Sequence, residues 1–287
     1  MDIVIVGSLA YDDLETDTGS VKNSLGGSGT FAGIAAAFHT SRRQDPGGTL
    51  PVGLVCAIGD DFDHSDFQLL KDAGLNMDGI ETIDGGRTFR WHGRDEGDMA
   101  QAITIETQQN VLDGYQPKVP AARWAPRVLF LANNHPSIQS HVLDQCEGAK
   151  YTALDSMNLW IDTAFEELSG VLRRIDLAIL NDNEVRMIAE DENLIRAGES
   201  IRSGEALTGG KEVGSGPDIL IIKKHERKKH ILPRLVPNRL QLGAGQQRYY
   251  ERQARDQQHR VQGSHDWNGI TGSDQGSETG SVGYCKA

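Results

Sequence analysis

The stretch NSLGGSGTFAGIAAAF, residues 23–38, places three glycines within four positions directly before an Ala-rich apolar segment. The apolar segment is typical of a helix, so Gly26, Gly27 and Gly29 lie at its N-terminus. Glycine there lets another group approach the backbone, and the amides of a helix N-terminus favour a polar or anionic ligand. The alternative, in which the glycines only let the helix pack tightly, stays open.

The spacing of these glycines separates them from two common nucleotide-binding loops. A dinucleotide fingerprint directly follows the first strand and has an acid about 20 residues later. Here about 18 residues separate the first apolar run from the glycines, and the candidate acid, Asp45, stands beside Pro46. No Gly-Lys-Ser/Thr follows, so the stretch is not a P-loop either. A nucleotide-cofactor oxidoreductase is therefore disfavoured.

Outward from this stretch, short apolar runs alternate with amphipathic segments. We expect strands at residues 3–7, 52–59, 128–133, 151–155, 176–182 and 219–224, and helices at residues 30–39, 62–73, 140–146, 163–175 and 183–191. This alternation indicates βαβ units and an α/β fold with a doubly wound, mostly parallel sheet. Polar, alternating segments at about 11–25 and 84–107 predict the strands of a second, small sheet.

Polar residues follow several of the predicted strands, at the carboxyl ends where ligands of such sheets bind. Asp12 comes shortly after the first strand, although an ordinary turn aspartate is the alternative. In the segment NDNE, residues 181–184, Asp182 or Asn183 could simply cap the following helix. Alternatively, Asn181 and Glu184 point at a hydrated Mg²⁺ carried by a nucleotide.

Composition narrows the partners and the compartment. The chain has 287 residues and a net charge of −12, which disfavours nucleic acid or an anionic membrane as a partner. Its three cysteines are far apart and form no Cys-x-x-Cys pair, which argues for a reducing, cytoplasmic location and against structural zinc. No apolar segment approaches the length needed to cross a membrane.

Eight segments, taken in order, resemble the ribokinase-like (PfkB) carbohydrate kinase family. They are VGSLAYD, NSLGGSGTFAGIAAA, VGLVCAIGDDF, DAGLNMDGI, RTFRW, ALDSMN, AILNDNE and LIIKK, and they span about residues 2–224. The resemblance implies a kinase core at residues 1–224 in which the small sheet is a lid. It also implies transfer of the γ-phosphoryl group of ATP, with Mg²⁺, to a hydroxymethyl of a sugar, nucleoside or related small alcohol. A homodimer through the lid is a further implication.

The resemblance assigns roles to six residues. It implies that Asp12 hydrogen-bonds acceptor hydroxyls and that Gly26 and Gly27 let the backbone reach the acceptor. It also implies that Arg90, on the lid that closes over the acceptor, takes part in binding it. Asn181 and Glu184 would hold the Mg²⁺–phosphate water network, with Glu184 reaching the metal through water. Phe31 stands where ribokinases carry an asparagine, which favours a less hydroxylated or aromatic-bearing acceptor.

The C-terminal part departs from the family. The family closes with a Gly-Ala-Gly-Asp segment whose amides form an anion hole and whose aspartate takes the proton of the attacking hydroxyl. Residues 243–246 here read Gly-Ala-Gly-Gln, and the flanking sequence does not match, so no catalytic base is identified. We therefore expect impaired transfer, since phosphoryl transfer depends on positioning and charge stabilisation. The alternative is a non-catalytic, small-molecule-binding pseudo-kinase.

The charge and the apolar content of the sequence change near Lys224. Residues 225–287 carry ten Lys or Arg against six Asp or Glu, a net charge of +4, whereas residues 1–224 carry −16. The tail also holds few aliphatic residues, so it cannot bury enough surface to offset the entropy of ordering. We expect a disordered, non-family tail, and our hypothesis is a change of reading frame at this point. RNA binding by the tail is disfavoured by its low charge density.

Overall fold

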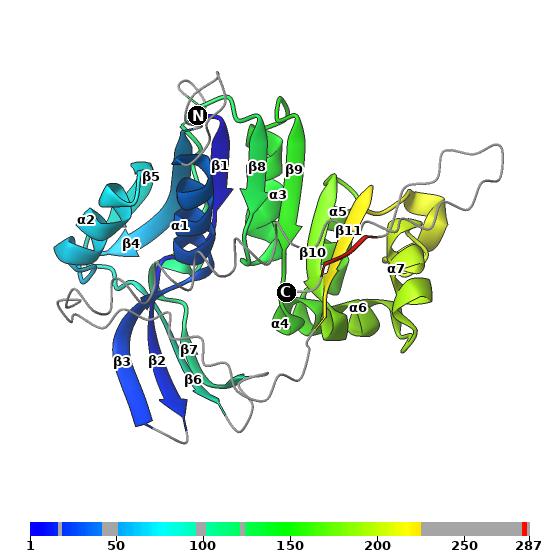
Figure 1. Cartoon of the computed structure of the whole chain (residues 1–287), viewed down its shortest axis with the longest axis horizontal. Helices are drawn as coiled ribbons and strands as arrows, with labels where there is room; N and C mark the ends of the chain where they lie inside the picture. Colours follow the sequence, from blue (N-terminus) through cyan, green and yellow to red (C-terminus); the bar gives the residue numbers. More distant parts are fainter. Residues whose placement is uncertain (17–18, 42–50, 96–101, 121–123, 225–282, 286–287) are drawn as a thin grey trace, which may run out of the picture. The chain divides into compact units, whose positions relative to one another are not determined.

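The computed structural model describes residues 1–16, 19–41, 51–95, 102–120, 124–224 and 283–285. Two sheets make up this part of the chain (Figure 1). The predicted disordered tail after Lys224, with its Gly-Ala-Gly-Gln segment, lies outside the described residues except for a three-residue strand at 283–285. The sequence did not predict that strand.

The larger sheet has eight strands in the order β12-β11-β10-β9-β8-β1-β4-β5, and every neighbouring pair is parallel. Its strands are β1 (Ile3–Val6), β4 (Val52–Gly59), β5 (Leu75–Ile83), β8 (Val128–Leu131), β9 (Tyr151–Asp155), β10 (Leu177–Asn181), β11 (Ile219–Lys223) and β12 (Gly283–Cys285). This confirms the predicted parallel α/β sheet.

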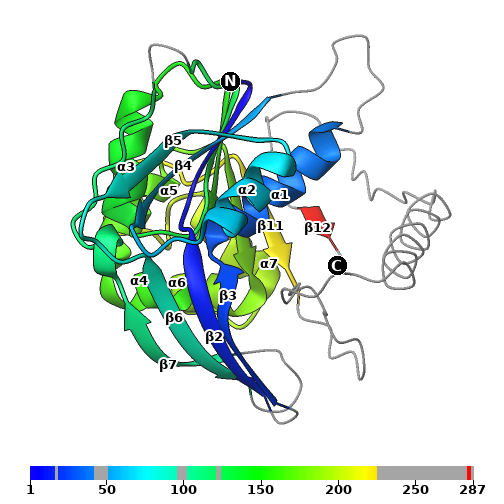
Figure 2. The same ribbon diagram turned by 90° about the vertical axis from the view of Figure 1, so that its left-hand side faces the viewer.

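Helices cover both faces of this sheet (Figure 2). They are α1 (Ser28–Ser41), α2 (His64–Asp72), α3 (Pro136–Gln145), α4 (Asn158–Thr163), α5 (Phe165–Leu172), α6 (Asp182–Ala189) and α7 (Leu194–Arg202). Side chains of one strand alternate between the faces, so Val4 and Val6 of β1 join the buried cluster that includes α3 and α5. Ile5 joins the other cluster, with α1 and α2. Burial on both faces explains why the central strands are continuous apolar runs.

The smaller sheet has the order β3-β2-β6-β7, with β2 and β6 parallel and the other pairs antiparallel. Its strands are β2 (Ala10–Thr16), β3 (Gly19–Gly26), β6 (Phe89–Asp95) and β7 (Ala102–Gln108). Only Gly7, Ser8 and Leu9 separate β1 from β2, so this sheet continues directly from the carboxyl end of β1 (Figure 1). The predicted small sheet is confirmed, and we call it the lid sheet.

Several helices and strands were not predicted from the sequence. The sequence did not predict β5, because it is an edge strand with only two buried residues, Leu75 and Gly79, and no continuous apolar run. It also missed α7, whose buried face consists of Ala197, Gly198 and Ile201. Short one-turn helices, η1 (Asn110–Leu112), η2 (Gly210–Val213) and the six-residue α4, were missed as well. Among the described residues no helix is both long and apolar enough to cross a membrane.

The buried centre of the larger sheet gives a test of the packing. Leu129 on β8 is fully buried, and we expect Leu129→Ala to lower the free energy of unfolding by about 3 kcal/mol, since it removes apolar contacts and leaves a cavity. Ile195→Ala is the control, because Ile195 is 56% exposed; we expect a change within about 0.5 kcal/mol. Urea denaturation measures both values, and equal losses would contradict this packing.

Candidate active site

The first part of the site joins Asp12 on β2 to Gly26 on β3. Ser24, two residues before Gly26, lies directly opposite Asp12 in the lid sheet. A Cβ atom placed on Gly26 would lie 1.9 Å from Asp12 Oδ2, so only glycine leaves room for the carboxylate. The structure thus brings together two of the residues that the sequence predicted, and it gives Gly26 a definite steric role.

The Asp12 carboxyl group is partly buried, and this changes its acidity. Burial, with a smaller effect from neighbouring Asp13, raises the pKa of Asp12 to about 6. Among the described residues its side chain has no hydrogen-bond partner. A carboxylate in this state is suited to accept hydrogen bonds from ligand hydroxyl groups.

The remaining glycines pack α1 against the connection between β1 and β2. Gly27 has φ +96°, and a Cβ there would lie 2.4 Å from the Ser8 carbonyl oxygen. Ser28 N donates to Ser8 Oγ at 3.1 Å, Ser8 N donates to Ser28 Oγ at 3.1 Å, and Gly29 N donates to Ser8 O at 2.9 Å. The backbone amides of Ser28 and Gly29 are therefore both used in packing against Ser8, which is the alternative that the sequence left open. A substrate role for Gly26 and Gly27 stays a prediction.

A second group lies at the carboxyl ends of β9, β10 and β11. Asn181 and Glu184 form a reciprocal capping box at the start of α6, in which Glu184 N donates to Asn181 Oδ1 at 2.8 Å and Asn181 N donates to Glu184 Oε2 at 2.8 Å. The N-cap is thus Asn181, whereas the sequence pointed to Asp182 or Asn183. Lys223 on β11 and Asp155 on β9 reach across the strand between them, β10, with Nζ 3.2 Å from Oδ1.

Burial and neighbouring charges change the acidity of the two carboxyl groups in this second group. Glu184 is 4% exposed, and burial raises its pKa to about 7, against the opposing effects of the Asn181 amide and Lys223. Burial also raises the pKa of Asp155, although Lys223 acts in the other direction. Two carboxyl groups and one ammonium group at a single edge suit a phosphate group with a hydrated cation. Within the described ranges, no three His, Cys, Asp or Glu side chains gather closely enough to hold a metal ion directly.

Arg90 lies apart from Asp12. In the pairing of β2 with β6, Arg90 is opposite Tyr11 and Trp91 is opposite Asp12. Because successive side chains of a strand point to opposite faces, Arg90 and Asp12 belong to opposite faces of the lid sheet. The residue that shares the face of Asp12 on β6 is Trp91, whose indole Nε1 donates to Thr104 Oγ1 at 3.1 Å.

Sequence reasoning missed an aromatic cluster beside the first group. Trp160 Nε1 donates to Asn133 Oδ1 at 2.9 Å, and the rings of Trp160 and His135 lie 5.0 Å apart in an edge-to-face arrangement. Ser28 Oγ donates to the carbonyl oxygen of Asn133 at 2.8 Å, which connects this cluster to the start of α1. The strand-end position of Asn133 was the available signal, but Trp160 comes from α4, which the sequence did not predict.

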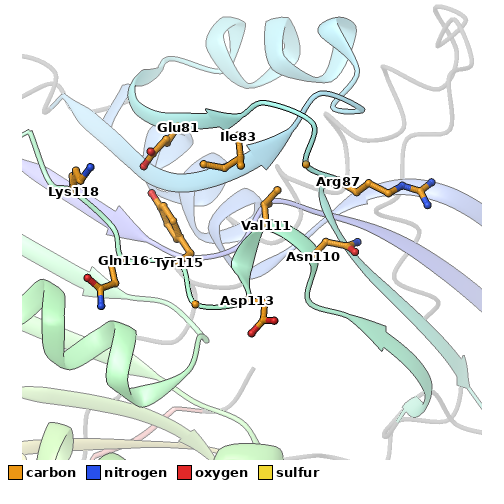
Figure 3. A pocket seen from close by; sticks show the side chains of 11 residues that line it. Glu81, Ile83, Arg87, Asn110, Val111, Asp113, Tyr115, Gln116 and Lys118 are labelled. Atoms are coloured by element: carbon orange, nitrogen blue, oxygen red, sulfur yellow. The ribbon is translucent and has the colours of Figure 1, made fainter.

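A cavity of about 680 Å³ lies elsewhere, beside the end of β5 and the chain leaving the lid sheet (Figure 3). It is lined by Glu81, Ile83, Gly86, Arg87, Asn110, Val111, Asp113, Gly114, Tyr115, Gln116 and Lys118. None of the six predicted site residues lines it. Its open, mixed-charge lining does not define a ligand class.

Solved kinase structures share this arrangement of a large parallel sheet and a small lid sheet. A probable sugar kinase from Rhizobium etli CFN 42 aligns with a TM-score of 0.57 at 14% identity, over 78% of this chain and 73% of that chain. Adenosine kinase from Sinorhizobium meliloti gives 0.57 at 15%, over 78% and 74%. Ribokinase from Cryptococcus neoformans var. grubii serotype A, solved with ADP, gives 0.52 at 19%, over 74% and 65%.

These likenesses establish the fold. No protein-family model matches the sequence, and the search among curated proteins finds no match. Identities below 20% with TM-scores above 0.5 define a common architecture and leave the activity to be argued from the site. The chain has the ribokinase-like fold, as the order of its sequence motifs predicted.

Close packing at Gly27 leads to a stability prediction. We expect Gly27→Ala to lower the free energy of unfolding by about 3 kcal/mol, because a positive φ is combined with a clash against the Ser8 carbonyl. Gly74→Ala is the matched control: Gly74 has φ +94°, but a Cβ there meets nothing within 4 Å, so about 1 kcal/mol is expected. Urea denaturation compares the two. If Gly27→Ala lowers the free energy of unfolding no more than Gly74→Ala does, the clash with the Ser8 carbonyl does not contribute.

The raised pKa of Asp12 predicts a pH-dependent difference in stability. Because the folded-state pKa of about 6 exceeds the ordinary value of 3.8, the folded protein loses stability relative to Asp12→Asn as pH rises from about 4 to about 6. Above pH 6 we expect Asp12→Asn to be more stable than wild type by up to about 3 kcal/mol, with no difference near pH 4. Denaturation at pH 4.5 and 8 measures this; a gap independent of pH would count against the burial of Asp12.

Proposed function

We propose that this chain is an ATP-dependent kinase that transfers a phosphoryl group to a hydroxymethyl of a sugar, nucleoside or related small alcohol. One observation carries the proposal: Asp12 is a partly buried carboxyl group, held against Gly26 beside the N-terminus of α1, in a ribokinase-like fold. Solved structures with this fold include a probable sugar kinase and an adenosine kinase. The proposed acceptor site is the Asp12 face of the lid sheet together with the start of α1.

On the acceptor side, Asp12 would accept hydrogen bonds from two neighbouring hydroxyl groups and so orient the hydroxymethyl group. Trp91 shares its face of the lid, and Phe31 on the first turn of α1 is 55% exposed. Trp91 supplies apolar surface on the face of the carboxylate, and Phe31 supplies it at the start of α1. They support an acceptor that combines hydroxyl groups with an apolar or aromatic part.

On the donor side, the carboxyl ends of β9, β10 and β11 would receive the phosphates. Lys223 would contact phosphate oxygens, and Asp155 and Glu184 would hold water molecules of a hydrated Mg²⁺. The donor set fits this role because its side chains supply carboxylate oxygens and one ammonium group at the same edge. Bound Mg²⁺ would neutralise the charge that develops on the phosphate oxygens.

The transfer step needs a base that the sequence does not supply in the expected place. The acceptor oxygen forms a bond to the γ-phosphorus, the bond from that phosphorus to the β–γ bridging oxygen breaks, and the hydroxyl proton must leave. Residues 243–246 read Gly-Ala-Gly-Gln with flanks that do not match the family, and they offer no aspartate to take up this proton. Slow transfer is therefore part of the proposal.

The same observation favours a second candidate function. A chain that binds the acceptor at Asp12 but has lost its base would act as a small-molecule-binding pseudo-kinase. A cytoplasmic location and a homodimer through the lid also belong to the proposal; Ile103 and Ile105 on β7 are 53% and 46% exposed and offer apolar surface for the lid contact.

Acceptor binding is the first test of the proposed function. Calorimetric titration with a panel of sugars and nucleosides should find a ligand for wild type, and Asp12→Ala should weaken its binding at least tenfold, because the carboxylate contributes charge-assisted hydrogen bonds. Asp72→Ala is the control, because Asp72 is exposed at the C-terminal end of α2, outside the lid sheet. Equal effects of the two substitutions would refute the assigned site.

ADP formation then separates the two candidate functions. With a binding acceptor and Mg²⁺–ATP, slow but acceptor-dependent ADP release supports the kinase, and binding without any release supports the pseudo-kinase. Resequencing the DNA around Lys224 and translating all frames gives an independent check. A Gly-Ala-Gly-Asp segment in another frame would identify the repaired chain as the one to assay.

A further inference from the structure

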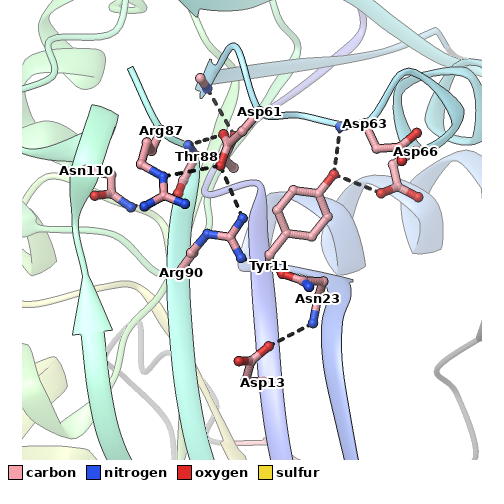
Figure 4. A network of polar contacts seen from close by, with 11 residues as sticks. Tyr11, Asp13, Asn23, Asp61, Asp63, Asp66, Arg87, Thr88, Arg90 and Asn110 are labelled. Carbon is pink, nitrogen blue, oxygen red and sulfur yellow. Dashed lines mark hydrogen bonds and ion pairs between the residues drawn. The ribbon is translucent and has the colours of Figure 1, made fainter. Parts of the chain in front are cut away.

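On the lid face opposite Asp12, three lid strands are attached to one stretch of the core (Figure 4). The attachment consists of Tyr11 on β2, Asn23 on β3, Arg90 on β6, and the acids Asp61 and Asp66 at and after the carboxyl end of β4. We call this group the clasp. It lies outside the acceptor site proposed above.

Tyr11 connects β2 to the N-terminus of α2. Its hydroxyl group donates to Asp66 Oδ2 at 2.9 Å and accepts from the backbone amide of Asp63 at 2.8 Å (Figure 4). Burial raises the pKa of Tyr11, so the phenol keeps its proton and remains a hydrogen-bond donor. The ring lies 5.6 Å from that of Phe62. One side chain thus holds the lid strand to the core through two hydrogen bonds and a ring contact.

Arg90 connects β6 and β3 to the same stretch. Its Nη2 lies 3.2 Å from Asp61 Oδ2, its Nη1 donates to Asn23 Oδ1, and its guanidinium group lies 5.4 Å from the centre of the Tyr11 ring. Burial acts to raise the pKa of Asp61, but hydrogen bonds from Thr88 and Arg90 hold it below its ordinary value. The ion pair therefore persists at neutral pH, where both groups are charged.

The clasp is linked to Asp12 through the backbone of β2. Tyr11 and Asp12 are consecutive, and their side chains point to opposite faces, so a rotation or shift of β2 that releases Tyr11 must also move Asp12. On the other face, the Asp12 carboxylate occupies the space that a Cβ atom on Gly26 would fill. The clasp fixes the strand on one side while the carboxylate is buried on the other.

We propose that the clasp positions Asp12, and that Tyr11 and Arg90 are positioning residues of the acceptor site. The part of this inference that concerns the acceptor rests on the proposed function. The structural part, that the clasp keeps β2 in place and Asp12 buried, stands without any ligand and is tested separately.

The experiment compares Tyr11→Phe with Tyr151→Phe. The first change keeps the ring and removes both hydrogen bonds of the clasp, and the second is the matched control because Tyr151 on β9 is 66% exposed. Native-state hydrogen exchange reports on the lid strands, and an NMR titration of the Asp12 carboxyl carbon reports on its burial. Asp61→Asn, which weakens the ion pair, is the second test variant.

For Tyr11→Phe and Asp61→Asn we expect at least tenfold faster exchange in β2 and β6, with β9 and β10 unchanged. We also expect the Asp12 midpoint to fall by at least one pH unit from about 6. A general loss of stability would leave the native-state midpoint where it is. An unchanged midpoint, or exchange that is faster by the same factor in all strands, overturns the proposal.

Acceptor affinity completes the test. If wild type binds an acceptor, Tyr11→Phe should raise its Kd at least tenfold, and an unchanged Kd overturns the positioning role. If wild type binds no acceptor, the proposed function fails, while exchange and titration still decide whether the clasp holds β2.

Discussion

The double hydrogen bond between Ser8 and Ser28 is the contact on which the site depends. Each backbone amide donates to the hydroxyl group of the other residue, which fixes the N-terminus of α1 against the chain between β1 and β2. Gly27 and Gly29 allow this approach, and Ser28 Oγ extends it to the Asn133 carbonyl at the end of β8. The first helix, the start of the lid sheet and a neighbouring strand are thereby set relative to one another. The place of Asp12 beside the helix follows from this contact.

The sequence predicted those parts of the fold whose burial leaves a continuous pattern. All eight residues of β4 are buried, so a run of apolar residues was sufficient to identify the strand. At the edge of the sheet, β5 has one neighbour and a mixed pattern, and its assignment needed the pairing with β4. The apolar residues of α7 do recur at helical spacing, so this helix could have been predicted from its sequence. Local periodicity reports burial, and it fails where partners far along the chain provide that burial.

The same limit applies to the site. Asp12, Asn181 and Glu184 could be selected because they follow buried strands, where an α/β sheet gathers its ligand-binding groups. The face of the lid on which Arg90 lies could not be predicted, since it depends on the register between β2 and β6. The Asp155–Lys223 pair also needed the strand order, because two separate parts of the chain provide its charges. Residue type and position in the chain identify candidates, and only the register and order of the strands group them.

The strand order also places the proposed acceptor site and the proposed donor site in different parts of the sequence, so a substitution can affect one without the other. The proposed acceptor residues lie on β2, β3, α1 and β6, all within the first 95 residues, whereas β11 and β12 stand at the far edge of the large sheet. Among the described residues, the strands that pair with β1 and β4 all come from before Lys224, and β12, which pairs with β11, comes from after it. In evolutionary terms, donor chemistry can decay or be replaced in such a fold while recognition of the acceptor persists.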